Sequence, residues 1–479
     1  MTWMLMLCVL GQAGRLAPSG LAPSAPGSSF GDSRFKGGRP APVAAAPWWQ
    51  AANDAHLQAL VAEALACGYD VRIAREKIAQ SRAQAAAALA PVLPSVSLDG
   101  AGSVSRGGTR LSGGGASGGG FFQSSTPIYI GSAALNASLN VDVWGKNYLA
   151  YAAAQKNYEA QGDTQDAVGV ALSYTVASTY HDAVAAKEQL ALAEEQLALN
   201  SDLAEVVSLR FASSEATALD VLQQRQLVAA SRARIPAVRV WLQVALNQLG
   251  ALLNRPGAVD VAEIGERLTL PPQPNTGKPV DLLGHRPDLR AAWALWLASS
   301  DASKSAFRAH LPTVGLNGSW GYQALVLTST ITQPTWSAGV TVSLPLFAGG
   351  GLSAAVAQAE ARERAASLAY AQAVRNAVAD VEQALAQEHE LGLQLEAVQE
   401  QLDAASQAFG ESKTRYLAGL TTYLNVTTAL TAKQQTEQSA VQARRALLGA
   451  RVGLLTALGG PWTRRLSRQA QQEASDEVR

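Results

Sequence analysis

Residues with catalytic or metal-binding chemistry are sparse in this chain, and their spacing fits no reactive site. The histidines are His56, His181, His285, His310 and His389. No two of them have the spacing usual for zinc ligands, and His389-Glu390 lacks the second histidine of a metalloprotease helix. The adjacent carboxylates Glu194 and Glu195 fall in a strongly helical stretch, where solvated charges are the ordinary interpretation. We therefore expect no catalytic residue, no metal site and no cofactor, and we predict that the protein is not an enzyme.

A second group of polar residues has the pattern needed to line a water-filled passage. These residues alternate with apolar ones, and they are Asp99, Asn136, Asn140, Asp142 and Asn317. Carboxylates on the wall of a passage favour cations, so Asp99 and Asp142 would tune which solutes pass. Structural hydrogen bonding is an equally good explanation of both residues. Either role requires strands with one polar and one apolar face.

Alternation of apolar and polar residues predicts four such β-strands. They cover about 95–105, 133–144, 313–323 and 336–347. A length of about ten residues with this pattern is typical of outer-membrane strands, which cross about 25 Å of hydrocarbon while their other face meets water. Half-buried strands of a soluble sandwich are the alternative. A membrane tolerates no open sheet edge, and a closed barrel needs at least about eight strands. Four strands cannot close by themselves, so we expect three copies of the chain to share a barrel of twelve strands.

A long helical stretch without internal proline follows each pair of strands, at about 146–211 and 352–416. At 1.5 Å per residue, each helix could reach on the order of 100 Å. Apolar residues in the distal halves step by three and four, which predicts coiled-coil packing. The predicted seams are Leu190, Ala193, Leu197, Asn200, Ala204, Val207 and Phe211 in the first helix and Leu395, Val398, Leu402, Ala405, Phe409, Ser412 and Tyr416 in the second. Return helices to about Leu253 and Leu458 then complete two helical hairpins.

The chain also repeats itself once. Asp70 to Pro94 matches Asp288 to Pro312 without a gap, and the two hairpins match in the same order. Two units of about 200 residues fused head to tail predict two equivalent halves that intertwine into one body. The predicted organisation is an apolar N-terminus and Gly/Pro/Ser-rich leader (1–47), repeat 1 (48–256), a linker (257–280), repeat 2 (281–462) and a polar tail (463–479).

Composition and the N-terminus narrow the class of protein further. Only 16% of residues are charged, against about 25% in typical soluble domains, and the formal net charge is zero. This composition argues against nucleic-acid binding. No apolar run reaches the length of a membrane-spanning helix. Met1 to Leu10 is apolar but short and lacks a basic region, so we expect a truncated export signal. Cys8 is a candidate lipidation site, although Leu7 stands where a lipoprotein signal has Gly or Ala.

Short motifs occur along the chain in a fixed order. They are Arg39-Pro40, Trp48-Trp49, Asn140 to Gly145, Arg210-Phe211, Leu219-Asp220, Leu282 to Arg290, Leu311-Pro312, Leu344 to Phe347, Arg415 to Gly419 and Leu458 to Trp462. In combination they resemble the TolC-type outer-membrane efflux proteins, most closely the lipoprotein (OprM-like and NodT-like) branch that serves tripartite multidrug pumps. The resemblance covers residues 39–462.

The resemblance implies a mainly α-helical protein with β-structure. Its homotrimer would place a twelve-stranded barrel in the outer-membrane lipid and continue as an α-helical tunnel through the periplasm. It would act as a passive duct for drugs or other small molecules, with a periplasmic adaptor (membrane fusion) protein and an inner-membrane RND-type pump as partners. Export of metal ions, or of proteins by type I secretion, is an alternative on the same fold. A soluble coiled-coil scaffold is a third hypothesis.

The resemblance also implies a periplasmic gate near the second hairpin turn, where Tyr423 and Leu424 match the family. Relatives often place an acidic residue four positions after this leucine, where the chain has Thr428, and Asn425 stands where the first repeat has Asp220. We therefore expect a ring of three Leu424 side chains, rather than an acidic ring, to close the tunnel. Ordinary interhelical packing is the alternative for Leu424, and a solvated helix charge is the alternative for Asp220.

Overall fold

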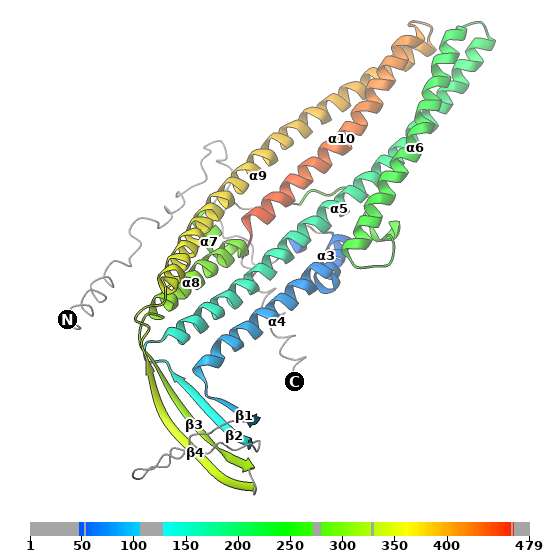
Figure 1. Cartoon of the computed structure of the whole chain (residues 1–479). Coiled ribbons are helices and arrows are strands. Elements are labelled where there is room, and N and C mark those ends of the chain that lie inside the picture. The colour runs from blue at the N-terminus through cyan, green and yellow to red at the C-terminus, as the bar shows by residue number, and fades with distance from the viewer. Residues whose placement is uncertain are drawn as a thin grey trace, which may run out of the picture. The chain divides into compact units, whose positions relative to one another are not determined.

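The computed structural model describes residues 47–51, 54–105, 128–271, 279–326, 330–460 and 463. The chain forms two compact units, and each unit takes segments from both repeats (Figure 1). Unit 1 contains Met1–Ile78, Ala160–Trp293 and Leu368–Arg479, whereas unit 2 contains Ala79–Glu159 and Ala294–Ser367. The two repeats are therefore intertwined. Cys8 lies outside the described residues.

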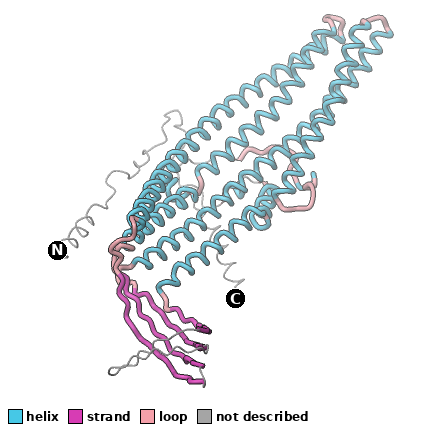
Figure 2. The backbone as a smooth tube through the Cα atoms, in the orientation of Figure 1, coloured by secondary structure: helices cyan, strands magenta, loops and turns pink. Residues whose placement is uncertain are grey.

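Helices make up most of unit 1, whereas unit 2 combines helical segments with the strands (Figure 2). They are α2 (Trp48–Ala51), α3 (Ala55–Cys67), α4 (Tyr69–Leu89), α5 (Lys146–Ala212), α6 (Ala218–Leu252), α7 (Leu282–His285), α8 (Pro287–Arg308), α9 (Gly351–Leu417) and α10 (Tyr423–Leu458), with short 3-10 turns at Ala90–Val92, Val261–Glu263 and Pro279–Asp281. The two predicted long helices are confirmed as α5 and α9, each of 67 residues. Among the described residues, no helix is both long and apolar enough to cross a membrane.

Local sequence explains where the helices begin and turn. Asp54 caps α3 by accepting hydrogen bonds from the backbone N–H groups of His56 and Leu57. Gly68 separates α3 from α4. The second hairpin turn contains Gly419 at φ 71°, which is the left-handed conformation that glycine adopts without steric cost at a helix C-terminus.

The strands form one antiparallel sheet in the order β1-β2-β3-β4. Their bounds are β1 Ser95–Ser105, β2 Ile128–Val141, β3 Thr313–Val326 and β4 Thr330–Ser343. The register places one apolar residue of each strand in a row across the sheet: Leu98, Leu135, Trp320 and Trp336. The neighbouring row on the other face is polar: Ser97, Asn136, Ser319 and Ser337. The alternation predicted from the sequence therefore gives two chemically distinct faces, and the apolar row is exposed in the protomer.

Two strands occupy different residues from those predicted. β2 covers 128–141 rather than 133–144, and β4 covers 330–343 rather than 336–347. Pro345 has no N–H group to donate to a ladder, and the apolar Leu346 and Phe347 beyond it are 90% exposed outside the sheet. Upstream, residues 128–132 lack clear alternation but pair with β1 and β3. Hydrogen-bonded pairing, which apolar periodicity does not report, sets these strand ends.

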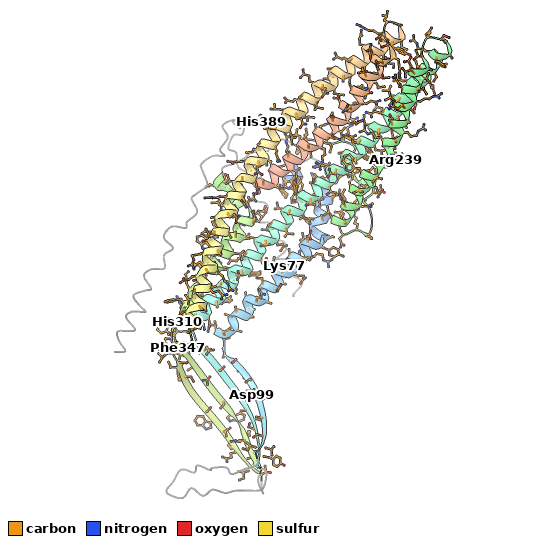
Figure 3. The ribbon with its side chains drawn as sticks, turned by 45° about the horizontal axis from the view of Figure 1, so that its top comes forward. Lys77, Asp99, Arg239, His310, Phe347 and His389 are labelled. Atoms are coloured by element: carbon orange, nitrogen blue, oxygen red, sulfur yellow. The ribbon has the colours of Figure 1, made fainter. Side chains whose placement is uncertain are left out.

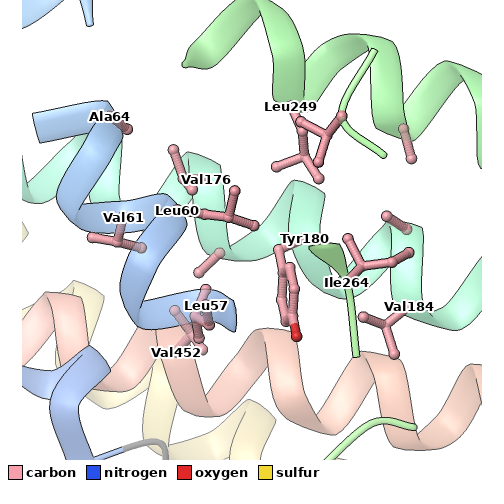
Figure 4. Packing of buried hydrophobic residues seen from close by; sticks show 14 of the residues in the cluster. Leu57, Leu60, Val61, Ala64, Val176, Tyr180, Val184, Leu249, Ile264 and Val452 are labelled. Carbon is pink, nitrogen blue, oxygen red and sulfur yellow. The ribbon is translucent and has the colours of Figure 1, made fainter. Parts of the chain in front are cut away.

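The hydrophobic core of unit 1 surrounds α5 near Tyr180 (Figure 4). Leu57 and Val176 are almost fully buried there, and the Tyr180 hydroxyl donates to Asp54 Oδ2 at 2.6 Å. Desolvation, helped by the Asp54 carboxylate, raises the pKa of Tyr180, so the hydroxyl stays protonated. At Gly250 an added Cβ would lie 1.8 Å from the carbonyl oxygen of Gly257. Close backbone approach therefore explains this glycine.

Candidate functional site

The predicted gate residues lie at the start of α10 and differ strongly in burial. Tyr423 is 2% exposed, whereas the adjacent Leu424 is 59% exposed. Asn425 donates from Nδ2 to Thr421 Oγ1 at 2.7 Å, and the Thr428 hydroxyl donates to the Leu424 carbonyl oxygen at 2.8 Å. Asn425 and Thr428 are thus engaged locally, and Leu424 presents an apolar side chain to the surroundings of the protomer.

Asp220 has a structural role at the start of α6. Its carboxylate accepts from the Thr217 backbone N–H at 2.8 Å, and its own N–H donates to the Thr217 hydroxyl at 3.2 Å. This reciprocal capping box satisfies two backbone donors of the first turn. A solvated charge is therefore an incomplete description of Asp220, because the carboxylate also helps the helix to begin.

The buried Tyr423 joins the two hairpins. Its hydroxyl donates to Gln224 Oε1 on α6, and Gln224 Nε2 donates to the Asn200 carbonyl oxygen on α5 at 2.6 Å. Gln224 and Asn200 are fully buried. Burial raises the pKa of Tyr423, so the donor is retained at any ordinary pH. A small group of side chains on α5, α6 and α10 thereby holds the second hairpin against the first.

Arg210 forms a second link between the hairpins. Its guanidinium lies 4.6 Å from the centroid of the Tyr416 ring, and its Nη1 donates to the Tyr416 carbonyl oxygen at 2.7 Å. Glu215 balances the charge at 3.4 Å. Cations are stabilised near the C-terminal end of a helix, here that of α9. Sequence reasoning identified Arg210 only as part of a motif, because its partners lie about two hundred positions away.

The seam of α5 differs from the one predicted, whereas that of α9 agrees. On α9, Leu395, Phe409 and Tyr416 are buried, and the other predicted positions are half-buried. On α5 the predicted Leu190 and Leu197 are only half-buried and Phe211 is exposed. The buried residues of this stretch are Gln189, Ala193, Gln196, Asn200, Leu203 and Val207. The prediction was wrong at Leu190 and Leu197 because it preferred each leucine to the glutamine that precedes it.

Amide hydrogen bonds explain why glutamine is tolerated in the α5 seam. Gln189 Nε2 donates to the Gln438 carbonyl oxygen at 3.0 Å, and Gln196 Nε2 donates to that of Gln434 at 3.2 Å. Buried polar groups are stable when they are hydrogen-bonded. The seven-residue spacing of Gln189 and Gln196 was the sequence signal that could have revealed this contact with α10.

The predicted passage-lining residues divide between the sheet and a turn. Asp99 (Figure 3) accepts from Asn136 Nδ2 at 2.6 Å, and Asn317 Nδ2 donates to Thr341 Oγ1 at 3.0 Å, so these side chains connect neighbouring strands. Asn140 is an exposed residue of β2. Asp142 lies beyond the end of β2 and accepts from the Tyr148 backbone N–H at 2.8 Å, which assigns it to the start of α5 rather than to a strand.

Comparison with known proteins identifies the family of the chain. Its residues 60–255 and 279–460 match the family of outer membrane efflux proteins. The chain belongs to this family. It is 33% identical over 420 residues to the pyoverdine export outer membrane protein OpmQ of Pseudomonas aeruginosa, covering 87% of each protein. It is 28% identical to nodulation protein T of Rhizobium leguminosarum bv. trifolii over 84% of this chain and 85% of that protein. A crystal structure of CusC covers 91% of this chain and 99% of that one, with 26% identity and a TM-score of 0.75.

This outer membrane efflux protein is a channel subunit of the cell outer membrane. Its fold is that of trimeric channels in which each protomer supplies four strands to a shared barrel and a pair of helical hairpins to a tunnel. Such channels work together with an adaptor and an inner-membrane pump. The open edges of β1 and β4 and the exposed apolar row Leu98, Leu135, Trp320 and Trp336 agree with this assignment.

Proposed function

We propose that the chain is the passive exit duct for small molecules delivered by a proton-coupled pump of the RND type, and that its gate is at the hairpin tips. The observation that carries the gate is the contrast between Tyr423, which is buried in the contact between hairpins, and Leu424, which is exposed beside it. The similarity to a pyoverdine exporter favours a small-molecule cargo. Export of metal ions or of proteins remains the alternative prediction.

The packing near the tips supports a movable gate. Tyr416, Tyr423 and Val426 pack with Val207 in one apolar cluster, and a cavity of about 120 Å³ lies beside the same residues. This space leaves room for the side chains of the cluster to change position. The cluster is held by a few polar links, so a partner that competes for those links would release the second hairpin.

Leu424 closes the tunnel in this proposal because three copies related by the three-fold axis can bury their exposed side chains against one another. Burial of apolar surface contributes about 25 cal/mol per Å². The neutral Asn425 and Thr428 add no charge to the constriction. Closure therefore depends on apolar contact and on the links made by Tyr423 and Arg210, and it does not require an acidic ring.

Single-channel recordings in planar bilayers test this gate. Leu424→Ser removes the apolar contact, and we expect a several-fold rise in conductance or in the occupancy of the open state. Leu219→Ser is the matched control, because Leu219 is the equivalent residue of the first repeat and is 62% exposed; we expect it to behave as wild type. Unchanged conductance of the Leu424 variant would exclude this residue as the constriction.

We further propose that Asp99, Asn136, Asn140 and Asn317 face the water-filled interior of the barrel. Asp99 and Asn136 are bonded to each other on the face opposite the exposed Leu98 and Trp336, and the latter face would contact outer-membrane lipid. Asp142 is left out of this set because it caps α5. Lipidation at Cys8 stays a prediction.

A further inference from the structure

Each helical hairpin of unit 1 combines an acidic outgoing helix with a basic return helix. Between Lys187 and Arg210, the charged residues of α5 are all acidic: Glu188, Glu194, Glu195, Asp202 and Glu205. Those of α6 after Asp220 are all arginines: Arg225, Arg232, Arg234 and Arg239. The second repeat has the same arrangement. Between Arg375 and Lys413, α9 has Asp380, Glu382, Glu388, Glu390, Glu396, Glu400, Asp403 and Glu411, whereas α10 has Lys433, Arg444, Arg445 and Arg451 with one acid, Glu437.

Within the protomer, the described ion pairs between these helices join a carboxylate of α5 or α9 to an arginine of α6 or α10. Arg451 on α10 pairs with Glu388 on α9, and Arg445 on α10 pairs with Asp182 on α5 at 2.6 Å. Arg239 on α6 pairs with Glu194 on α5 at 3.1 Å. In unit 1, α10 and α5 lie between α9 and α6 (Figure 1). Figure 3 shows the same order from another direction, with His389 on α9 and Arg239 on α6 on opposite sides of the helices. The signs therefore alternate across the four helices and leave one acidic edge and one basic edge.

Five exposed charges on α6 and α9 form no described ion pair or hydrogen bond. On α6, Arg225 and Arg232 are exposed and form no described ion pair or hydrogen bond. On α9 the same holds for Glu396, Glu400 and Asp403. Both sets are separated by steps of three, four or seven residues, so each forms one stripe along its helix. A basic stripe at one edge and an acidic stripe at the other are complementary surfaces.

We propose that the α6 stripe of one copy pairs with the α9 stripe of the next copy, so that charge alternation continues around the trimer. The occupant of each edge is thus a second copy of this chain. The hairpin tips of one protomer are tied together by Arg210 and Tyr423, and a three-fold rotation moves copies around the axis without shifting them along it. The tips of all hairpins therefore lie at one level, and antiparallel α6 and α9 can be compared residue by residue from that level.

One unpaired arginine of α6 and one unpaired acid of α9 lie at the same level. Arg232 lies fourteen residues after Ala218, the first residue of α6, and Asp403 lies fourteen residues before Leu417, the last residue of α9. Arg239 and Glu396 are likewise twenty-one residues from those ends. Helices rise by about 1.5 Å per residue, so equal counts give equal heights. Arg232 and Asp403 lie at the same height, and neither forms a described ion pair within the protomer.

Charge reversal tests the pairing through the thermal dissociation of the purified trimer in detergent at low salt. Arg232→Glu and Asp403→Arg should each lower the dissociation temperature by several degrees, because each places like charges together, and the double variant should recover most of the loss. Added salt should shrink all of these differences, since surface charge pairs are screened. Glu195→Arg, an exposed reversal on α5, is the control and should leave the temperature near that of wild type. Additive losses in the double variant would overturn the proposal.

Cross-linking tests directly whether Arg232 of one copy and Asp403 of the next lie at the same height. In a background with both native cysteines replaced, Cys8→Ser and Cys67→Ser, a short bis-maleimide should join Arg232→Cys of one copy to Asp403→Cys of the next and give covalent oligomers in denaturing gels. Arg232→Cys combined with Glu390→Cys is the control, because Glu390 lies thirteen positions before Asp403, which displaces the pair by about 20 Å along the helix. Absence of the 232–403 product, or equal yields for both pairs, would overturn the proposed register, and neither result depends on where the gate is.

Discussion

Replacing Tyr423 with phenylalanine removes one hydroxyl from the contact between the two hairpins. In the wild type this hydroxyl donates to Gln224 Oε1, and Gln224 is fully buried. The other end of the Gln224 amide already donates to the Asn200 carbonyl oxygen, so the side chain cannot turn to recover its bond without losing another. Phenylalanine retains the ring that packs against Tyr416. The substitution therefore isolates the hydrogen bond.

The magnitude follows from leaving a buried acceptor without a donor. Such a loss costs about 1–3 kcal/mol. If the bond is present only when the tips are closed, the equilibrium between closed and open tips shifts by about 5- to 150-fold toward open in each subunit. Because each protomer contains its own copy of the link, the effect on the trimer is at least as large as that on one hairpin.

Single-channel recording measures this shift as open-state occupancy. We expect Tyr423→Phe to raise the occupancy, whereas Tyr416→Phe should match wild type, because no hydrogen-bond partner for the Tyr416 hydroxyl is found among the described residues. Both variants keep an aromatic ring in the same cluster. The reasoning is refuted if Tyr423→Phe forms intact trimers whose open-state occupancy equals that of wild type, or if the Tyr416 variant opens equally.

Two further predictions concern stability. Arg290 donates to Asp163 at 2.7 Å and to the fully buried Asp166 at 3.0 Å, so Arg290→Met should destabilise the fold by about 3–5 kcal/mol; thermal melting should show this loss, and the exposed-pair control Arg364→Met should show almost none. Burial chiefly lowers the pKa of His181 to about 4, with Asp54 and Arg445 as the facing charges. Its neutral form is therefore favoured in the fold, so stability present above about pH 6.5 should decline by up to about 3 kcal/mol toward pH 4. His181→Leu should remove this part of the decline between pH 7 and 5, and identical pH profiles would contradict the assignment.

Helix and strand identity could be predicted from the sequence because both depend on local periodicity. The long helices α5 and α9 begin and end within one residue of their predicted bounds, and the return helices α6 and α10 end within one residue of theirs. The two chemical faces of the sheet were likewise predicted, since alternate residues of a strand must face opposite sides. Leu424 was identified through family resemblance, and its exposure is compatible with the role predicted for it.

The contacts between segments distant in sequence could not be predicted in the same way. Arg210 and Gln224 became candidates for holding the gate only when their partners Tyr416 and Tyr423 were placed beside them, about two hundred residues away along the chain. The extra residues of β2 likewise became a strand through pairing with β1 and β3.

The sequence alone therefore determined the types and order of the elements, the lengths of the two long helices and the duplication that gives two hairpins. The tertiary structure decided which face of α5 is buried, and it selected Gln189 and Gln196 over Leu190 and Leu197. The physical reason is that hydrophobic periodicity records the average preference of each residue for water. A glutamine can be buried when its amide is hydrogen-bonded to a neighbouring helix, because that bond replaces the bonds to water. Only the position of that neighbour shows that the bond can form.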